Sequence, residues 1–158
     1  MNFQQAKQRA ENLSPANVSK ALFNEIRRIE QDFFNLNIGQ IEESEDSFGE
    51  ILNNKDKRFG GVYTEATEEI AKLENPVAPK KAGEPYNFLW TGDFLSGFEL
   101  TISGETASLK STGTGSGDKK AFFDGYENLF GLTDESLNRV ISEKLLPFFI
   151  QYYRNELT

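Results

Sequence analysis

The side chains that carry most enzyme chemistry are sparse in this sequence. It contains no histidine and no cysteine, which excludes a Ser–His–Asp triad, a thiolate nucleophile and a zinc site built on either residue. There remain 25 acidic residues and a set of serines, none singled out by its spacing. We therefore expect a protein that is not an enzyme and holds no cofactor or metal. A carboxylate pair or a serine in a cleft stays open as an alternative.

The run Gly113-Thr-Gly-Ser-Gly117 has the composition of a loop that cradles phosphate groups. A Walker A loop, however, needs four residues and then Gly-Lys-Ser/Thr after its first glycine, whereas here Asp118 stands five residues after Gly113. An anion at that position would repel a phosphate. We therefore expect a flexible loop over residues 111–120, either mobile or ordered at an interface, in preference to a nucleotide site.

Charged residues gather in two further places. The acidic run from Glu42 to Glu50 lacks the alternating ligands and the glycine of an EF-hand calcium loop, so it predicts a solvated face or an arm that meets a partner. The main basic groups are either ordinary loop charge or a contact with an acidic neighbouring subunit. They are Lys55, Lys57, Arg58, Lys80 and Lys81.

Length and composition indicate one domain over residues 1–158. Such a chain is long enough to bury a core, and its 14 phenylalanines predict that rings build that core. A net charge of −8 disfavours nucleic acid as a direct partner, because negative surfaces repel phosphate backbones. No apolar run approaches the ~18 residues of a membrane span, and the first residues do not resemble a signal peptide. The lack of cysteine fits a reducing compartment.

Hydrophobic spacing predicts helices through the first half of the chain. Residues 3–13 predict a peripheral helix, or an arm that orders on a partner. Ser14-Pro15 begins a second helix, whose apolar stripe carries it to about Asn37. A short helix is expected near residues 48–53. A further helix is expected over residues 64–73, and the residues that face its core are Ala66, Ile70 and Leu73.

Alternation of apolar and polar residues predicts a β-hairpin in the second half. Three prolines make residues 75–85 an extended connector. A helical turn within residues 89–96 then leads into a hairpin over residues 97–111. The apolar face of its first strand consists of Phe98, Leu100 and Ile102.

A long C-terminal helix completes the predicted α+β fold, which joins N-terminal helices to the central antiparallel β-hairpin. Thr133 is expected to cap this helix and Pro147 to kink it, because proline removes a backbone donor and clashes with the preceding turn. Phe149 and Tyr153 widen its apolar stripe beyond one face. This favours a second buried surface, such as one covered by an identical subunit.

Two landmarks in the second half resemble proteins of tailed bacteriophages. The first is Leu89-Trp-Thr-Gly-Asp-Phe-Leu-Ser-Gly-Phe98, which precedes the alternating strand and the glycine-rich run. The second is Phe130-Gly-Leu-Thr-Asp-Glu-Ser-Leu137, which opens the last helix. In this order they resemble the small neck, tail-completion and minor-tail families.

In those families a hydrophobic-x-Thr-Gly-x-Leu-x-x-Ser segment introduces a β-hairpin packed under a long helix. Thr91, Gly92 and Phe98 occupy this pattern here, with Leu95 displaced by one position and Gly97 where a serine is often found. The resemblance covers about residues 60–158.

The resemblance implies a structural protein of the virion, assembled in the host cytoplasm. Copies would form a homo-oligomeric ring in the head–tail connector, neck or tail-completion region and contact adjacent portal, neck or tail proteins. It implies neither a membrane nor sequence-specific nucleic acid as a partner. The alternative is a soluble cytoplasmic adaptor or regulatory binding module. The candidate motif and interface residues are Trp90, Thr91, Gly92, Asp93, Gly113, Gly115, Gly117, Lys119 and Lys120.

Overall fold

Helices dominate the structure, and one two-stranded sheet lies beside them. The computed structural model describes residues 2–55, 60–75, 78–90 and 92–157. Its α-helices are α1 (Phe3–Asn12), α2 (Pro15–Arg28), α3 (Glu30–Glu42), α4 (Glu65–Glu74), α5 (Asp93–Ser96), α6 (Gly117–Asp124), α7 (Asp134–Val140) and α8 (Leu146–Leu157). The other elements are strands β1 (Phe98–Ser103) and β2 (Thr106–Ser111), the 3-10 turn η1 (Thr112–Thr114) and the π-helical segment η2 (Ile141–Leu145). The predicted α+β class is confirmed.

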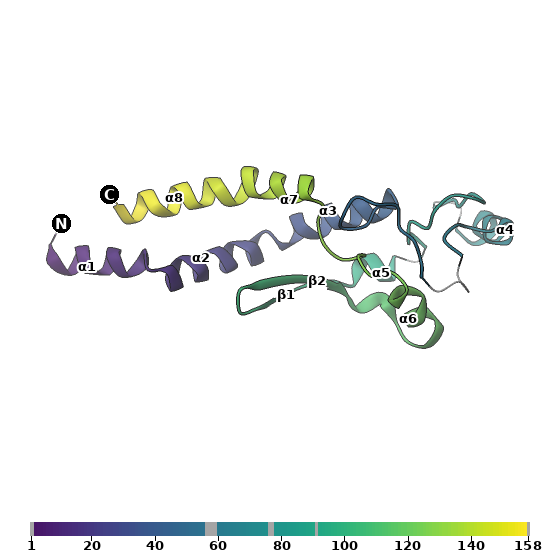
Figure 1. The fold of residues 1–158 in the computed structure, drawn as a ribbon, viewed down its shortest axis with the longest axis horizontal. Coiled ribbons are helices and arrows are strands. Elements are labelled where there is room, and N and C mark those ends of the chain that lie inside the picture. Colours follow the sequence, from purple (N-terminus) through teal and green to yellow (C-terminus); the bar gives the residue numbers. More distant parts are fainter. Residues whose placement is uncertain (1, 56–59, 76–77, 91, 158) are drawn as a thin grey trace.

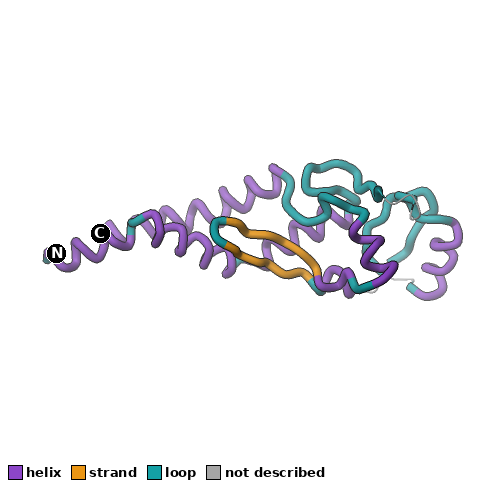
Figure 2. Tube along the Cα trace, turned by 60° about the horizontal axis from the view of Figure 1, so that its bottom comes forward, coloured by secondary structure: helices purple, strands orange, loops and turns teal. Residues whose placement is uncertain are grey.

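The molecule is elongated. The helices α1 and α2 follow one another along its length, and α7, η2 and α8 run back beside them, so both described chain ends lie at the same end (Figure 1). The hairpin lies alongside α2, whereas α4 lies at the opposite end, beyond α3 (Figure 1). Most of the loop structure gathers at the α4 end, away from the helix pair (Figure 2).

The predicted N-terminal helix over residues 3–13 forms as α1. Asn2 and Gln5 cap it reciprocally, since each side chain accepts a hydrogen bond from the other's backbone N–H, at 2.9 and 3.0 Å. None of its residues is buried. It is held to α8 by the Tyr152 hydroxyl, which donates to the Asn12 carbonyl at 2.8 Å.

The second predicted helix is divided in the structure. It begins at Pro15 as expected, but Ile29 (φ −104°, ψ 20°) leaves the helical conformation and α3 then continues to Glu42, five residues beyond the expected end at Asn37. No glycine or proline stands near the break. The buried Ile29 side chain instead packs in a core with Ile26 and Val140, so tertiary packing sets the break.

Two buried amides of α3 attach the segment that leads into the C-terminal helix. The Asn37 amide donates to the Leu129 carbonyl at 3.2 Å and accepts from the Gly131 N–H at 3.4 Å. One turn later, the Gln40 amide donates to the Gly131 carbonyl and accepts from the Thr133 N–H, at 3.2 and 3.1 Å. These bonds satisfy backbone groups that no sheet or helix serves.

The C-terminal helix begins where the sequence predicts, because the Thr133 hydroxyl accepts from the Ser136 N–H at 3.2 Å. Near Pro147, where the sequence predicts a kink, the helix contains the π-helical segment η2, which ends two residues before the proline. There the Leu146 N–H bonds to the Ile141 carbonyl, one residue further back than in an α-helix.

The hairpin confirms the predicted alternation. Strands β1 and β2 pair antiparallel, with Phe98 opposite Ser111 and Ser103 opposite Thr106. Leu100, Ile102 and Leu109 pack against the helix-pair core, which contains Ile26, Ile29, Phe33, Val140 and Leu145. The hairpin therefore covers one side of the helices.

A second core, built largely of rings, connects the hairpin to the loop-rich end. Its buried members are Ile41, Leu52, Phe88, Phe94, Phe98, Phe123, Tyr126 and Leu129. The Phe94 and Phe123 rings stack with centroids 4.4 Å apart. The abundance of phenylalanine thus has the structural role that composition predicts.

Three local predictions are wrong. The region of the expected helix at 48–53 is a hydrogen-bonded turn closed by a bridge between Glu45 and Ile51. The helix expected over 64–73 forms as α4 but buries Ala71, whereas Ala66, Ile70 and Leu73 are exposed, because the core contacts only one narrow side of it. The expected flexible loop over 111–120 contains the end of β2, η1 and the start of α6.

Candidate functional site

The two candidate stretches of the sequence analysis meet in the structure. Gly92 (φ +83°) precedes α5, and Asp93 begins that helix. The glycine-rich segment packs directly on it, since a Cβ added at Gly113 would lie 2.6 Å from the Asp93 carbonyl carbon. The Ser111 hydroxyl donates to the Phe94 carbonyl at 2.6 Å and accepts from the Gly113 N–H at 3.0 Å. The first glycine of the run therefore serves close packing.

The other glycines of the run form the turn into α6. Gly115 and Gly117 have φ values of +66° and +59°, which side chains rarely adopt. A Cβ at Gly115 would also come within 2.8 Å of the Lys119 side chain. Lys119 in turn lies 3.9 Å from an Asp93 carboxylate oxygen, and Lys120 bonds to Asp124 at 2.8 Å. Gly113 and Lys119 thus lie next to Asp93, and Gly115 packs against the Lys119 side chain.

Trp90, the single tryptophan, lines a pocket of about 260 Å³ next to this assembly. The Trp90 carbonyl accepts a 2.5 Å hydrogen bond from the Asn75 amide at the end of α4. We call this hollow the aromatic pocket; it is lined by Tyr63, Thr67, Tyr86, Phe88, Trp90, Lys119, Phe122 and Phe123. Its wall is therefore almost entirely rings, with one cation.

Phe88 sits in the aromatic pocket in a strained backbone conformation. Its φ of +56° is rare for a bulky residue. Its ring lies 5.5 Å from Phe123, 5.6 Å from Phe122 and 4.9 Å from Tyr126, between ring centroids. These contacts offset the backbone strain, which often marks a functional position.

A buried lysine stands behind the aromatic pocket. Lys80 is 4% exposed, its ammonium group donates to the Asn87 amide oxygen at 2.9 Å, and it lies 5.5 Å from the centre of the Tyr63 ring. Burial lowers the pKa of Lys80 and raises the pKa of Tyr63. The sequence predicted either ordinary loop charge or a contact with an acidic neighbouring subunit at Lys80, and no local pattern marks it as buried.

The remaining sequence candidates are dispersed. Thr91, Lys57 and Arg58 lie outside the described residues. Lys55 forms an ion pair with Glu127, and Lys81 lies 3.9 Å from Glu84. Within the described ranges, no group of three or more acidic side chains is arranged to hold a metal ion.

The acidic run contains one well-ordered feature, which we call the acidic turn (residues 45–51). One Asp46 carboxylate oxygen accepts hydrogen bonds from the Phe48 and Glu50 N–H groups, at 2.8 and 3.0 Å. The Asp46 N–H donates to the Glu50 carbonyl at 2.8 Å. The Phe48 ring at the tip is 74% exposed.

An apolar stripe follows the outside of the C-terminal helix. We call it the outer stripe; its members, 39–70% exposed, are Leu137, Ile141, Leu146, Ile150, Tyr153 and Leu157. The five-residue step from Ile141 to Leu146 spans η2, where a π-turn takes one residue more than an α-turn. The stripe therefore stays continuous across the irregularity. Among the described helices, none combines the length and apolarity that crossing a bilayer requires.

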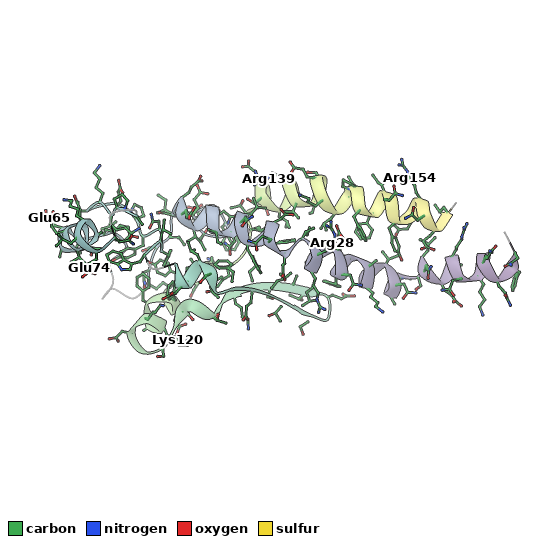
Figure 3. The ribbon with its side chains drawn as sticks, turned by 180° about the vertical axis from the view of Figure 1, so that it is seen from behind. Arg28, Glu65, Glu74, Lys120, Arg139 and Arg154 are labelled. Carbon is green, nitrogen blue, oxygen red and sulfur yellow. The ribbon has the colours of Figure 1, made fainter. Side chains whose placement is uncertain are left out.

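Charged side chains lie at both ends of the molecule. Glu65 and Glu74 lie on α4 at one end, whereas Arg154 lies on α8 at the other, and Lys120 lies on α6 near the α4 half (Figure 3).

Comparison with protein families, curated proteins and solved structures finds no match to this chain.

Proposed function

We propose that this chain is a structural subunit of a tailed-phage virion, positioned in the head–tail connector, neck or tail-completion ring. The observation that carries the proposal is the outer stripe, a row of six apolar side chains that stay 39–70% exposed in the monomer. A helix face of this kind is expected to be covered by another protein surface. The kind of assembly, a ring at the head–tail junction, is inferred from the resemblance of residues 60–158 to neck and tail-completion proteins.

The exposed area of the monomer agrees with a subunit that is completed by neighbours. Its accessible surface is 10140 Å², compared with about 8,000 Å² for a compact monomer of 17.9 kDa. The excess of about 2,000 Å² is comparable to the roughly 1,600 Å² that two ring neighbours cover at about 800 Å² each. An elongated chain therefore exposes enough surface to be covered by two neighbouring subunits.

The test is the composition of intact particles. Particles purified from a lysed source culture are expected to contain this protein at a copy number near that of the portal protein, or half of it, by quantitative mass spectrometry. Absence of the protein from particles would overturn the proposal and favour a soluble adaptor.

Incorporation of variants tests the outer stripe itself. Ile150→Glu, supplied during infection by a phage that lacks the gene, places a charge in the stripe and is expected to be lost from particles. Gln151→Glu adds the same side chain at the next, exposed position and is expected to be incorporated normally. Equal incorporation of both variants would show that the stripe faces solvent in the virion.

A further inference from the structure

The acidic turn displays an aromatic ring on a rigid support. Besides the two bonds to Asp46, the Ser47 N–H donates to the Asn128 carbonyl at 2.9 Å, and Glu45 and Ile51 form a β-bridge. Phe48 nevertheless stays 74% exposed. An exposed ring on an ordered turn loses little conformational entropy when it binds, which favours its use as an anchor.

The aromatic pocket has the size and lining to receive one such ring. Its volume of about 260 Å³ exceeds the roughly 150 Å³ of an apolar cavity that binds benzene. The rings of Tyr86, Phe88 and Phe122 line it, so an incoming phenyl group would find edge and face contacts of the kind that aromatic pairs prefer.

The charges around the two features are complementary. Phe48 is flanked by Glu45, Asp46 and Glu50, whereas the charged residue in the pocket wall is Lys119. Lys119 is half-exposed, and its 3.9 Å separation from Asp93 is long for an ion pair, so it can also meet an incoming carboxylate.

Two of the four acids on the neighbouring helix α4 are paired within that helix, whereas Glu65 and Glu74 add negative charge near the pocket. Glu68 and Glu69 both pair with Lys72, at 3.0 and 2.7 Å. Glu68 also accepts a 2.8 Å hydrogen bond from the Ala82 N–H.

A second copy of the chain supplies the ring. The acidic turn contacts the segment around Asn128, whereas residues 63–67, 86–90 and 119–123 line the pocket, so the two surfaces share no residue. The high exposure of Phe48 shows that it does not occupy the pocket of its own chain. Two different patches of one chain that bind each other make a heterologous contact, which builds a ring where the rotation between copies closes and an open filament where it does not.

We propose that Phe48 of one copy inserts into the aromatic pocket of the next copy, with the acidic turn facing Lys119. This inference rests on the proposed function, since it supplies the contact between neighbouring subunits of the ring.

Trp90 provides a direct measurement, because the only tryptophan of the chain lines the pocket. In the purified full chain, the particle mass by light scattering is expected to rise with concentration, and Trp90 emission to move to shorter wavelength in parallel. Phe48→Ala should remove both changes. Phe3→Ala deletes an even more exposed ring on α1, at 84%, and should leave both unchanged.

A mixing experiment tests whether the contact is head-to-tail, with the ring of one copy in the pocket of the next. Thr67→Phe fills the pocket from α4 but keeps the acidic turn, whereas Phe48→Ala keeps the pocket and loses the ring. Each variant alone is expected to be monomeric, and an equimolar mixture is expected to stop at heterodimers, because only one of the two contacts can form. High salt should weaken these dimers.

The outcomes separate this contact from the function. The inference would be overturned if Phe48→Ala assembles like the wild type, or if the wavelength of Trp90 emission does not change with assembly. This holds even if the protein is found in particles. Absence from particles, with assembly still abolished by Phe48→Ala, would overturn the virion proposal and leave the contact standing.

Discussion

Gly113 lies against the backbone of Asp93, so close that a Cβ at residue 113 would fall 2.6 Å from the Asp93 carbonyl carbon and equally close to the Phe94 Cα. This contact joins the end of the hairpin to the start of α5. It also holds the glycine-rich segment beside α5, where Lys119 lies 3.9 Å from an Asp93 carboxylate oxygen. Gly113 stands in a run whose composition is typical of flexible loops, yet its lack of a side chain permits this close packing.

Replacement of Gly113 by alanine should destabilise the fold. The methyl group would displace backbone atoms, for which we expect a loss of about 2–4 kcal/mol in the free energy of unfolding, measured by urea denaturation. Gly39→Ala is the control, because nothing lies within 4 Å of the added Cβ inside α3. It should gain about 0.5–1 kcal/mol. Equal effects of the two changes would contradict the close packing.

Asn37 should be the costliest polar residue of α3 to remove. It is fully buried, and its amide serves the Leu129 carbonyl and the Gly131 N–H. Asn37→Ala leaves both groups unpaired and should lose about 2–3 kcal/mol of unfolding free energy by urea denaturation. Asn35→Ala, on the exposed side, should stay within about 0.5 kcal/mol of wild type. A small effect at Asn37 would show that water replaces its bonds.

Local signals account for what the sequence predicted correctly. The cap at Thr133 and the start at Pro15 depend on a few adjacent residues, and the alternation around Phe98 reports which side of a strand is buried. The hairpin, the long helix and the aromatic core follow from such signals.

The missed features depend on contacts between distant residues. The apolar stripe predicted a helix end at about Asn37, yet Leu129 and Gly131, about ninety positions later, satisfy the Asn37 amide inside the core. Ile29 breaks its helix through packing against Val140. The aromatic pocket likewise gathers residues from three separate segments, so composition predicted its rings but not their location.

The Glu25–Arg28 pair should make stability depend on acid pH. Arg28 donates two hydrogen bonds to the buried Glu25 carboxylate, at 2.7 and 2.6 Å, and they hold the pKa of Glu25 below its usual value. The unfolded chain therefore binds the proton more readily. The stabilisation is present above the unfolded pKa of about 4.3 and is lost as pH falls through the lower folded value.

Glu25→Gln should therefore be less stable than wild type at pH 7 and approach it below about pH 4. Because Arg28 is 69% exposed, we expect a difference of only about 1 kcal/mol. Glu11→Gln, in an exposed pair with Lys7 at 3.8 Å, should change little in the same pH series. A constant difference from pH 3 to pH 7 would contradict the role of the Glu25 charge.

Lys80 should make stability depend on pH at the alkaline end, and its charge, unlike that of Glu25, should destabilise the fold. It is buried behind Tyr63, and burial holds its pKa below the usual value, so folding disfavours the protonated form. The wild type should gain stability as pH rises from the folded pKa toward the unfolded value of about 10.4. Below that range the cost of the buried charge is fully present.

Lys80→Met retains most of the apolar stem and removes the charge, so it should be more stable than wild type at pH 7, with an advantage that shrinks toward pH 10.4. The Asn87 amide oxygen keeps its bond from the Tyr63 hydroxyl at 2.9 Å. Lys81→Met is the control, because Lys81 is 74% exposed and should show no such pH dependence. Urea denaturation at intervals from pH 7 to pH 10.5 measures both. A Lys80→Met variant that is less stable than wild type at pH 7 would show that the contacts of the amine with Asn87 and Tyr63 outweigh its burial.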